Sequence, residues 1–149
     1  MAETTTDQMS LGLMGAALTA LDIEFEAIDD RTLEATFAAT GGPYRLTATV
    51  PESGNSFRLE MTRQMTIGVN QLSWARKKAN EHNRQMDFAV AILEPWPYGR
   101  KGTQLYKTRA LYPTGPGCTL MQLATWTTIF IQQSRYIFDD LQGLTRTYT

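Results

Sequence analysis

Few side chains in this chain could carry acid–base, nucleophilic or metal chemistry near neutral pH, because it holds one histidine and one cysteine. His82 lies in the polar run Asn80–Arg84 without a second His or Cys at metal-ligand spacing, so we expect it on the exposed face of a helix. Cys118 precedes a predicted helix N-terminus, where the helix dipole favours a thiolate, but no partner base accompanies it. The sequence therefore predicts a protein that is not an enzyme, with no catalytic residue, cofactor or metal site.

Two pairs of adjacent carboxylates and one pair of glycines could also suggest a site. Side chains of neighbouring residues diverge, on a strand to opposite faces and on a helix by 100°. We therefore expect Asp29-Asp30 in a hairpin turn and Asp139-Asp140 at a solvated helix end. Gly115-x-Gly117 precedes a helix, but it lacks the third glycine of a dinucleotide loop and the lysine of a P-loop. These residues predict turns and helix ends, and no cation or phosphate site.

Hydrophobic periodicity predicts the elements that would position any site. Apolar and polar residues alternate in the strands and recur at helical spacing in the helices. The predicted strands are 33–39, 44–50, 57–61, 87–94 and 103–112, and the acidic run 23–30 follows the first helix. The predicted helices begin at a Thr6 or Asp7 cap, at Thr66, and at the capping box Thr119-x-x-Gln122. The fold class is therefore α+β, an antiparallel sheet flanked by helices in the order helix, three or four strands, helix, two strands, helix.

Two further features of the elements can be predicted. Phe88–Leu93 (FAVAIL) is apolar on both faces, which places this strand at the centre of the sheet. Residues 1–149 form a single domain, in which we expect 1–8 and 144–149 to be flexible ends.

Charge is distributed unevenly along the chain. Residues 1–63 hold ten Asp/Glu and four Lys/Arg, a net charge of -6, whereas 64–149 hold five and ten, a net charge of +5. The two halves should attract each other, within one chain or between subunits. The start MAETTTDQMS lacks the features of a signal peptide, and polar residues interrupt the closing helix, so we expect a cytoplasmic protein without a membrane segment.

The closing helix, 119–138, has apolar side chains on two sides. Its core stripe includes Leu123, Phe130 and Ile137, with Trp126 at the margin. The opposite side carries Met121, Ile129 and Tyr136 among uncharged Gln and Thr, where a self-sufficient monomer would show charge. We therefore predict that this helix contacts a partner protein and that the protein forms a homodimer.

Cations lie beside aromatic residues between positions 74 and 101. Trp74 lies close to Arg76, Lys77, Lys78 and Arg84, and Trp96 and Tyr98 lie in a Pro-rich loop before Arg100 and Lys101. Such residues can bind phosphates and stack bases, so a nucleic-acid-binding regulator is the alternative function. The sequence pI of about 5.8 argues against nucleic acid, and favours Trp74, Trp96 and Tyr98 as contacts for a protein.

The helix ending in Ala79-Asn80-Glu81-His82-Asn83-Arg84, the strand Phe88–Leu93 directly after it, a second strand and a long closing helix together resemble the YbjN family. They also resemble the related class I type III secretion chaperone fold, over roughly residues 11–141. The resemblance implies a small, usually dimeric α+β protein without cofactor that holds a polypeptide segment on its sheet or helix surface. Our leading hypothesis is a chaperone or adaptor that assists the assembly or regulation of a client protein. Its partner-binding residues would be Trp74, Trp96, Tyr98, Met121, Trp126, Ile129 and Tyr136.

Overall fold

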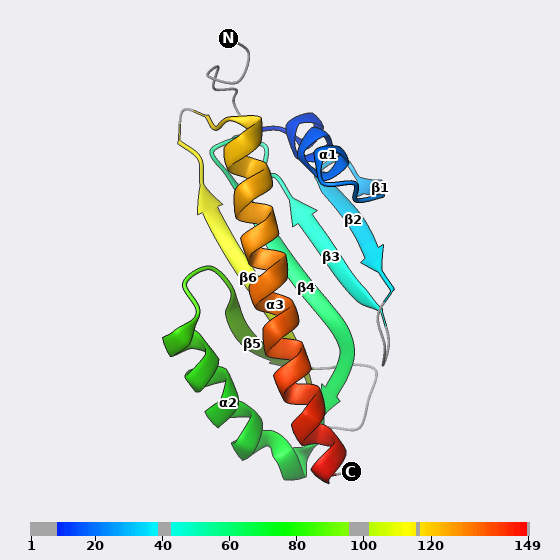
Figure 1. The fold of residues 1–149 in the computed structure, drawn as a ribbon, viewed down its shortest axis with the longest axis vertical. Coiled ribbons are helices and arrows are strands. Elements are labelled where there is room, and N and C mark those ends of the chain that lie inside the picture. Colours follow the sequence, from blue (N-terminus) through cyan, green and yellow to red (C-terminus); the bar gives the residue numbers. More distant parts are fainter. Residues whose placement is uncertain (1–8, 39–42, 96–101, 116, 149) are drawn as a thin grey trace.

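Six strands form one sheet in the spatial order β1-β2-β3-β4-β6-β5 (Figure 1). The computed structural model describes residues 9–38, 43–95, 102–115 and 117–148, with only the backbone at 64–66 and 142–148. Every neighbouring pair of strands is antiparallel, as the alternating sequence predicts. The strands are β1 (Glu26–Asp29), β2 (Thr32–Phe37), β3 (Tyr44–Thr49), β4 (Ser56–Ile67), β5 (Val90–Pro95) and β6 (Gln104–Pro113).

Three helices cover one face of this sheet. In Figure 1, α3 (Leu120–Tyr148) lies along the sheet, with α1 (Leu11–Ala20) at its side and α2 (Leu72–Gln85) next to β5. The predicted capping box starts α3: the Thr119 N–H donates to Gln122 Oε1 at 2.9 Å, and the Gln122 N–H donates to Thr119 Oγ1 at 3.0 Å. α3 extends beyond Phe138, through most of the segment 144–149 for which a flexible end is predicted.

The register separates a buried face of the sheet from an open one. Ala48, Leu59 and Ala110 lie side by side on three neighbouring strands, and all three are buried against the helices. Helix α3 contributes Leu123, Phe130, Ile137 and Phe138 to this core, and α1 contributes Met14, Ala17 and Leu18. The alternate residues of the strands form the open sheet face, which the helices do not cover.

Two helices begin later than the sequence predicts. Ser10 caps α1, since its Oγ accepts from the Leu13 N–H at 3.1 Å, and the expected caps Thr6 and Asp7 lie outside the described residues. The prediction of a helix from Thr66 is wrong, because β4 continues to Ile67 and a 3-10 turn, η2 (Val69–Gln71), precedes α2. Thr66 and Ile67 are β-branched residues, which favour the strand, and Gly68 ends it.

The prediction that Phe88–Leu93 forms a central strand is also wrong, because β5 is an edge strand. Its outer backbone groups are covered by side chains instead of by another strand. Asn83 donates from Nδ2 to the Ala91 carbonyl at 3.2 Å, and its Oδ1 accepts from the Ala91 N–H at 2.6 Å. Gln133 Oε1 accepts from the N–H groups of Phe88 and Ala89, both at 3.0 Å. With α2 against it, an edge strand can therefore be apolar on both faces.

Asn83→Leu is expected to lower the free energy of unfolding by about 1–2 kcal/mol and to increase aggregation, because it removes both hydrogen bonds and exposes a strand edge. Urea unfolding and light scattering on concentrated samples measure the two effects. Asn80→Leu is the matched control, since Asn80 is exposed one turn earlier and forms no hydrogen bond within the described part of the chain. Equal stability of the two variants would show that the contact between Asn83 and Ala91 contributes nothing.

Candidate interaction surfaces

The lone histidine lies in a buried polar cluster between α2, α3 and β6. His82 is 2% exposed, with its ring Nδ1 3.1 Å from the Tyr106 hydroxyl and Nε2 3.0 Å from Asp140 Oδ2. Lys78 Nζ lies 3.2 Å from the same Asp140 oxygen. The expectation of an exposed His82 is therefore wrong, because the helix face that carries it packs against Tyr106 and α3.

The pKa values of Asp140 and Tyr106 are shifted by their surroundings in this cluster. Burial would raise the pKa of Asp140, but hydrogen bonds from His82 and Lys78 prevail and hold it below its usual value. Burial raises the pKa of Tyr106, and the Asp140 carboxylate raises it further. An acid, a histidine and a hydroxyl in a row are the groups of a proton relay, but the hydroxyl of Tyr106 is wholly buried and not aimed at a surface. The cluster therefore fastens α2 and α3 to the sheet.

The other residues singled out for chemistry also have structural roles. Asp139 accepts from the Tyr44 hydroxyl at 2.7 Å and lies 3.5 Å from the buried Arg63 guanidinium. The Asp139 side chain is solvated as predicted, at 66% exposed, but Asp139-Asp140 is not at a helix end, because α3 continues to Tyr148. Asp29 does lie in the hairpin turn, where its Oδ1 accepts from the Arg31 N–H at 2.8 Å. Cys118 is buried with its Sγ 3.9 Å from Met9 Sδ. Among the described residues, no group of three His, Cys, Asp or Glu side chains could hold a metal ion.

Charged side chains on the open sheet face neutralise one another. Lys107, only 6% exposed, lies 2.6 Å from Glu60 Oε2 and 2.7 Å from Glu94 Oε1. Burial would raise the pKa of Glu60, but the hydrogen bond and charge of Lys107, with Arg109 and Arg58, lower it. The contacts of Glu60 with Lys107 and Arg109 join the acidic and basic halves within one chain, as their charges predict. The charges of this face are thus balanced within the chain, and the same face exposes the apolar side chains of Leu111 and Val90.

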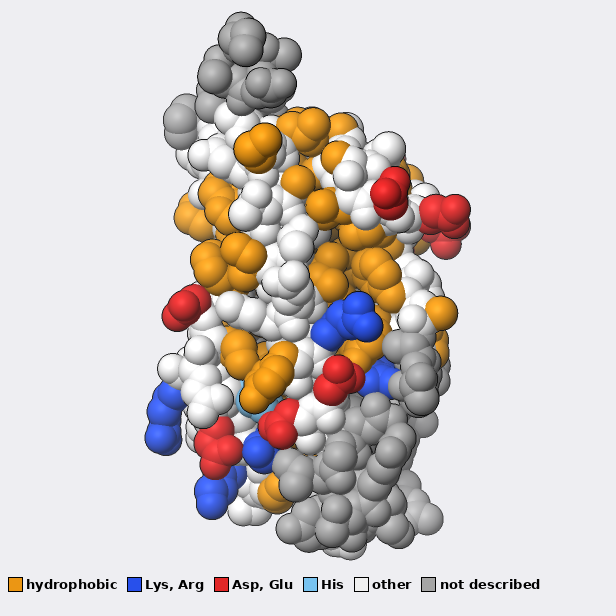
Figure 2. Space-filling model, viewed as in Figure 1, with side chains coloured by type: hydrophobic (Ala, Val, Ile, Leu, Met, Phe, Trp, Pro, Cys, Tyr) orange, Lys and Arg blue, Asp and Glu red, His pale blue; other side chains and the backbone are white. Residues whose placement is uncertain are grey.

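The outer face of α3 is different, because it is apolar and almost uncharged. We use this name for Met121, Thr125, Ile129, Gln132 and Tyr136, which share one side of the helix. Met121 is 69% and Tyr136 58% exposed, while Ile129 is half-buried. Figure 2 shows mainly hydrophobic and uncharged side chains over the upper part of this side of the molecule, with charged side chains near its middle, at its rim and at its lower end. The structure thus brings together three of the residues predicted to bind a partner.

The remaining predicted contact residues do not join this face. Trp126 is half-buried and stacks on Tyr112, with ring centroids 5.7 Å apart and an interplanar angle of 7°. Trp74, on α2, also packs against the core. Trp96 and Tyr98 lie outside the described residues. Trp126 and Trp74 are therefore partly buried side chains that pack against the core, which the sequence indicated only for Trp126, at the margin of the core stripe.

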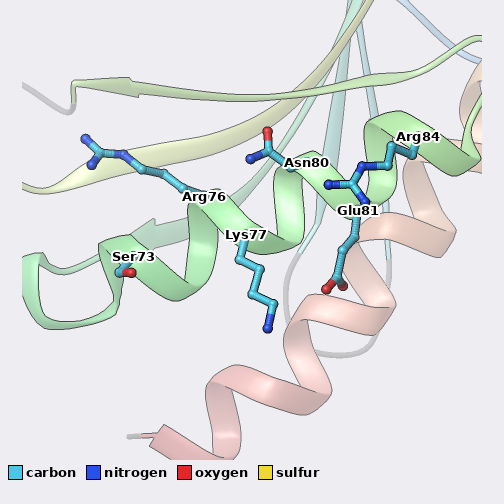
Figure 3. Close-up of a pocket in the computed structure, with 6 residues that line it drawn as sticks. All are labelled: Ser73, Arg76, Lys77, Asn80, Glu81 and Arg84. Atoms are coloured by element: carbon cyan, nitrogen blue, oxygen red, sulfur yellow. The ribbon is translucent and has the colours of Figure 1, made fainter.

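A second candidate surface lies on the outer side of α2. A shallow hollow of about 400 Å³ is lined by Ser73, Arg76, Lys77, Asn80, Glu81 and Arg84. Figure 3 shows that all six side chains come from this one helix, with Arg76 and Lys77 pointing in different directions. We call these six residues the α2 basic face, because they carry three cations and one carboxylate.

The fold, unlike the sequence, has a match among known proteins. No protein-family model matches the chain, and no curated protein matches its sequence. The crystal structure of YbjN from E. coli, described as a candidate transcription regulator, superposes with a TM-score of 0.74 over 95% of this chain and 96% of that one. This chain has a YbjN-like fold. The identity of 10% means that the likeness concerns the fold alone.

The YbjN-like fold confirms the α+β architecture that the order of elements predicts. It also agrees with the resemblance recognised in the run Ala79–Arg84 and the following strand. The structure supplies a physical reason for part of that pattern, since Asn83 binds the backbone of β5. Within the described ranges, no helix is both long and apolar enough to cross a membrane.

Proposed function

We propose that the protein is a non-enzymatic chaperone or adaptor that binds a client polypeptide through the outer face of α3. The observation that carries this proposal is the contrast between two surfaces. The charges of the open sheet face are paired within the chain, whereas the outer face of α3 exposes Met121 and Tyr136 without a carboxylate between them. Exposed apolar side chains that form a continuous patch are typical of an interaction site. A partner-binding regulator is also compatible with the description of YbjN.

The size of this face limits the strength of any contact. Met121 and Tyr136 are separated by about 22 Å along the helix axis, which at a helix width of about 10 Å gives a patch of about 220 Å². A standard protein interface buries about 800 Å² on each partner, so the contact must extend over neighbouring elements. Figure 2 shows hydrophobic side chains continuing from α3 toward α1, which α3 contacts. We therefore place the client across α3 and α1, with Met121, Ile129 and Tyr136 as its central contacts.

Without a client, the same face would pair with a second copy. A two-fold dimer requires only one self-complementary patch, and an uncharged stripe does not repel itself. We expect a homodimer of twice 16.7 kDa that dissociates on dilution, with a dissociation constant of about 10 µM. Competition between client and second copy would then couple dimer dissociation to client binding.

Ile129→Glu is expected to weaken self-association about tenfold or more, because a carboxylate in a desolvated contact without a partner costs upwards of 1 kcal/mol. Light scattering after gel filtration over a range of concentrations measures the effect. Thr36→Glu is the control, since Thr36 is exposed on the open sheet face and acquires the same charge. A wild-type protein that stays monomeric at 100 µM, an order of magnitude above the expected constant, would contradict the dimer.

The client is tested with the same variants as bait. Affinity purification from the native cell followed by mass spectrometry should give one stoichiometric protein with the wild type and with Thr36→Glu. Ile129→Glu should lose it while circular dichroism shows a retained fold. Equal recovery with all three baits would reject the outer face of α3 as the client site.

A further inference from the structure

The α2 basic face holds cations that no described side chain neutralises. Among the side chains that the structure describes, Arg76, Lys77 and Arg84 form no ion pair and no contact with an aromatic ring. The remaining described cations pair with carboxylates or lie over the Tyr44 ring: Arg31, Arg45, Arg58, Arg63, Lys78, Lys107, Arg109 and Arg135. The described cations without such a contact therefore all belong to the α2 basic face. The single carboxylate there, Glu81, pairs with Lys78 at 3.6 Å.

The spacing of these cations indicates the shape of a ligand. Arg76 and Arg84 are separated by about 12 Å along the helix axis. Arg76 and Lys77 point in different directions, so the cations do not converge on one point (Figure 3). A single small anion would contact one of them at a time. An extended polyanion, with charges repeated along its length, could contact all three.

We propose that the α2 basic face binds the phosphodiester backbone of double-stranded DNA. A helix with its side chains is about 10–12 Å wide, close to the roughly 12 Å width of the B-DNA major groove, so its flanks reach the phosphates of both strands. The deep, narrow major groove of an RNA duplex does not admit a helix. Binding to a single strand needs aromatic rings on which bases stack, and Trp74, the aromatic residue of α2, packs against the core.

This activity is independent of the proposed function, since it uses α2 and leaves the outer face of α3 free. The overall pI argues against nucleic acid, but it averages over charges that are already paired. A phosphate backbone interacts with the net charge of the α2 basic face that it contacts, and not with the net charge of the whole chain. Contacts from three cations would supply affinity without sequence preference.

Fluorescence anisotropy with a labelled duplex of about 20 base pairs, recorded from 50 to 200 mM salt, tests the proposal. With three phosphate contacts, the logarithm of the affinity should fall with the logarithm of the salt concentration with a slope of about −2.7, a loss of about fortyfold over this range. Lys77→Ala should reduce the slope by about one. Arg76→Ala/Lys77→Ala/Arg84→Ala should abolish binding at 50 mM salt.

The matched control is Arg31→Ala/Arg45→Ala/Arg58→Ala, which removes as much positive charge from ion-paired sites of the sheet. This variant should bind the duplex like the wild type, with circular dichroism confirming the fold of both triple variants. Equal loss in the two triple variants, or no binding by the wild type at 50 mM salt, would overturn the proposal. A polyglutamate peptide that competes as well as unlabelled duplex would reassign the surface to an acidic protein segment. None of these results affects the test with Ile129→Glu, which concerns the outer face of α3.

Discussion

Trp126→Ala is expected to lower the free energy of unfolding by about 3–5 kcal/mol, a large part of the 5–15 kcal/mol typical of a domain. The indole stacks on Tyr112 and also on Phe57, at 6.2 Å between ring centroids and an interplanar angle of 23°. Phe57 is itself fully buried and stacks on Tyr112 at 4.7 Å. Truncation would leave a cavity bounded by rigid rings that cannot collapse to fill it. Urea unfolding followed by circular dichroism measures the loss.

Two companion variants separate a core role for Trp126 from a binding role. Trp126→Phe keeps an aromatic ring and should recover more than half of the loss. Met121→Ala, on the exposed side of the same helix, should change stability by no more than about 0.5 kcal/mol. If Trp126→Ala unfolds at the same urea concentration as the wild type but fails to bind the client, Trp126 is a binding anchor after all.

The parts of the fold that the sequence predicts well are those with a strong local signal. Residues 33–37 and 44–49 alternate apolar and polar side chains, and this period of two fixes both the strand and the face that it buries. Thr119 and Gln122 form a capping box from one turn of sequence. Such features depend on neighbours a few residues away, so no knowledge of the remainder of the chain is needed.

The failures have non-local causes. The apolar run Phe88–Leu93 is compatible with a central strand until Asn83 and Gln133, one of them 45 residues beyond Phe88, are seen to cover its backbone. Helical spacing from Thr66 to Gln71 competed with pairing of Thr66 and Ile67 to β6, which only the sheet reveals. In both cases tertiary contacts outweighed a weak local preference.

The candidate surfaces were predictable to different degrees. Met121, Ile129 and Tyr136 could be placed on one side of α3 because helical geometry fixes their relative directions. The cations of the α2 basic face are visible in the sequence as a run, but the sequence does not show which cations of that run form ion pairs. Lys78, within the same run, pairs with Asp140, which lies 62 residues further along the chain. The prediction of an exposed His82 fails for a similar reason, because its polar neighbours in the sequence are not its neighbours in space.

His82→Ala is expected to lower the free energy of unfolding by about 2–4 kcal/mol at pH 7. It removes a hydrogen bond to the Asp140 carboxylate, and it leaves the buried Tyr106 hydroxyl without a partner among the described side chains. Lys78→Ala is the control, because Lys78 meets the same carboxylate from a more exposed side and should cost less than about 1 kcal/mol. Both variants are compared with the wild type by urea unfolding.

The acid limb of the stability curve gives a second, independent test of the His82 contact. The pKa of Asp140 is lower in the folded chain than the roughly 3.9 of an unfolded aspartate, so its ionised form stabilises the fold above that value. This contribution is lost as the pH falls through the folded pKa of Asp140, because the unfolded chain then binds the proton first. Removing His82 takes away one of the hydrogen bonds that lower this pKa, so His82→Ala should lose less stability than the wild type between pH 5 and 3, about one unit either side of the reference value. Parallel acid limbs in the two proteins would mean that His82 and Asp140 do not interact in solution, and that α2 is held to α3 by Lys78 and by apolar packing instead.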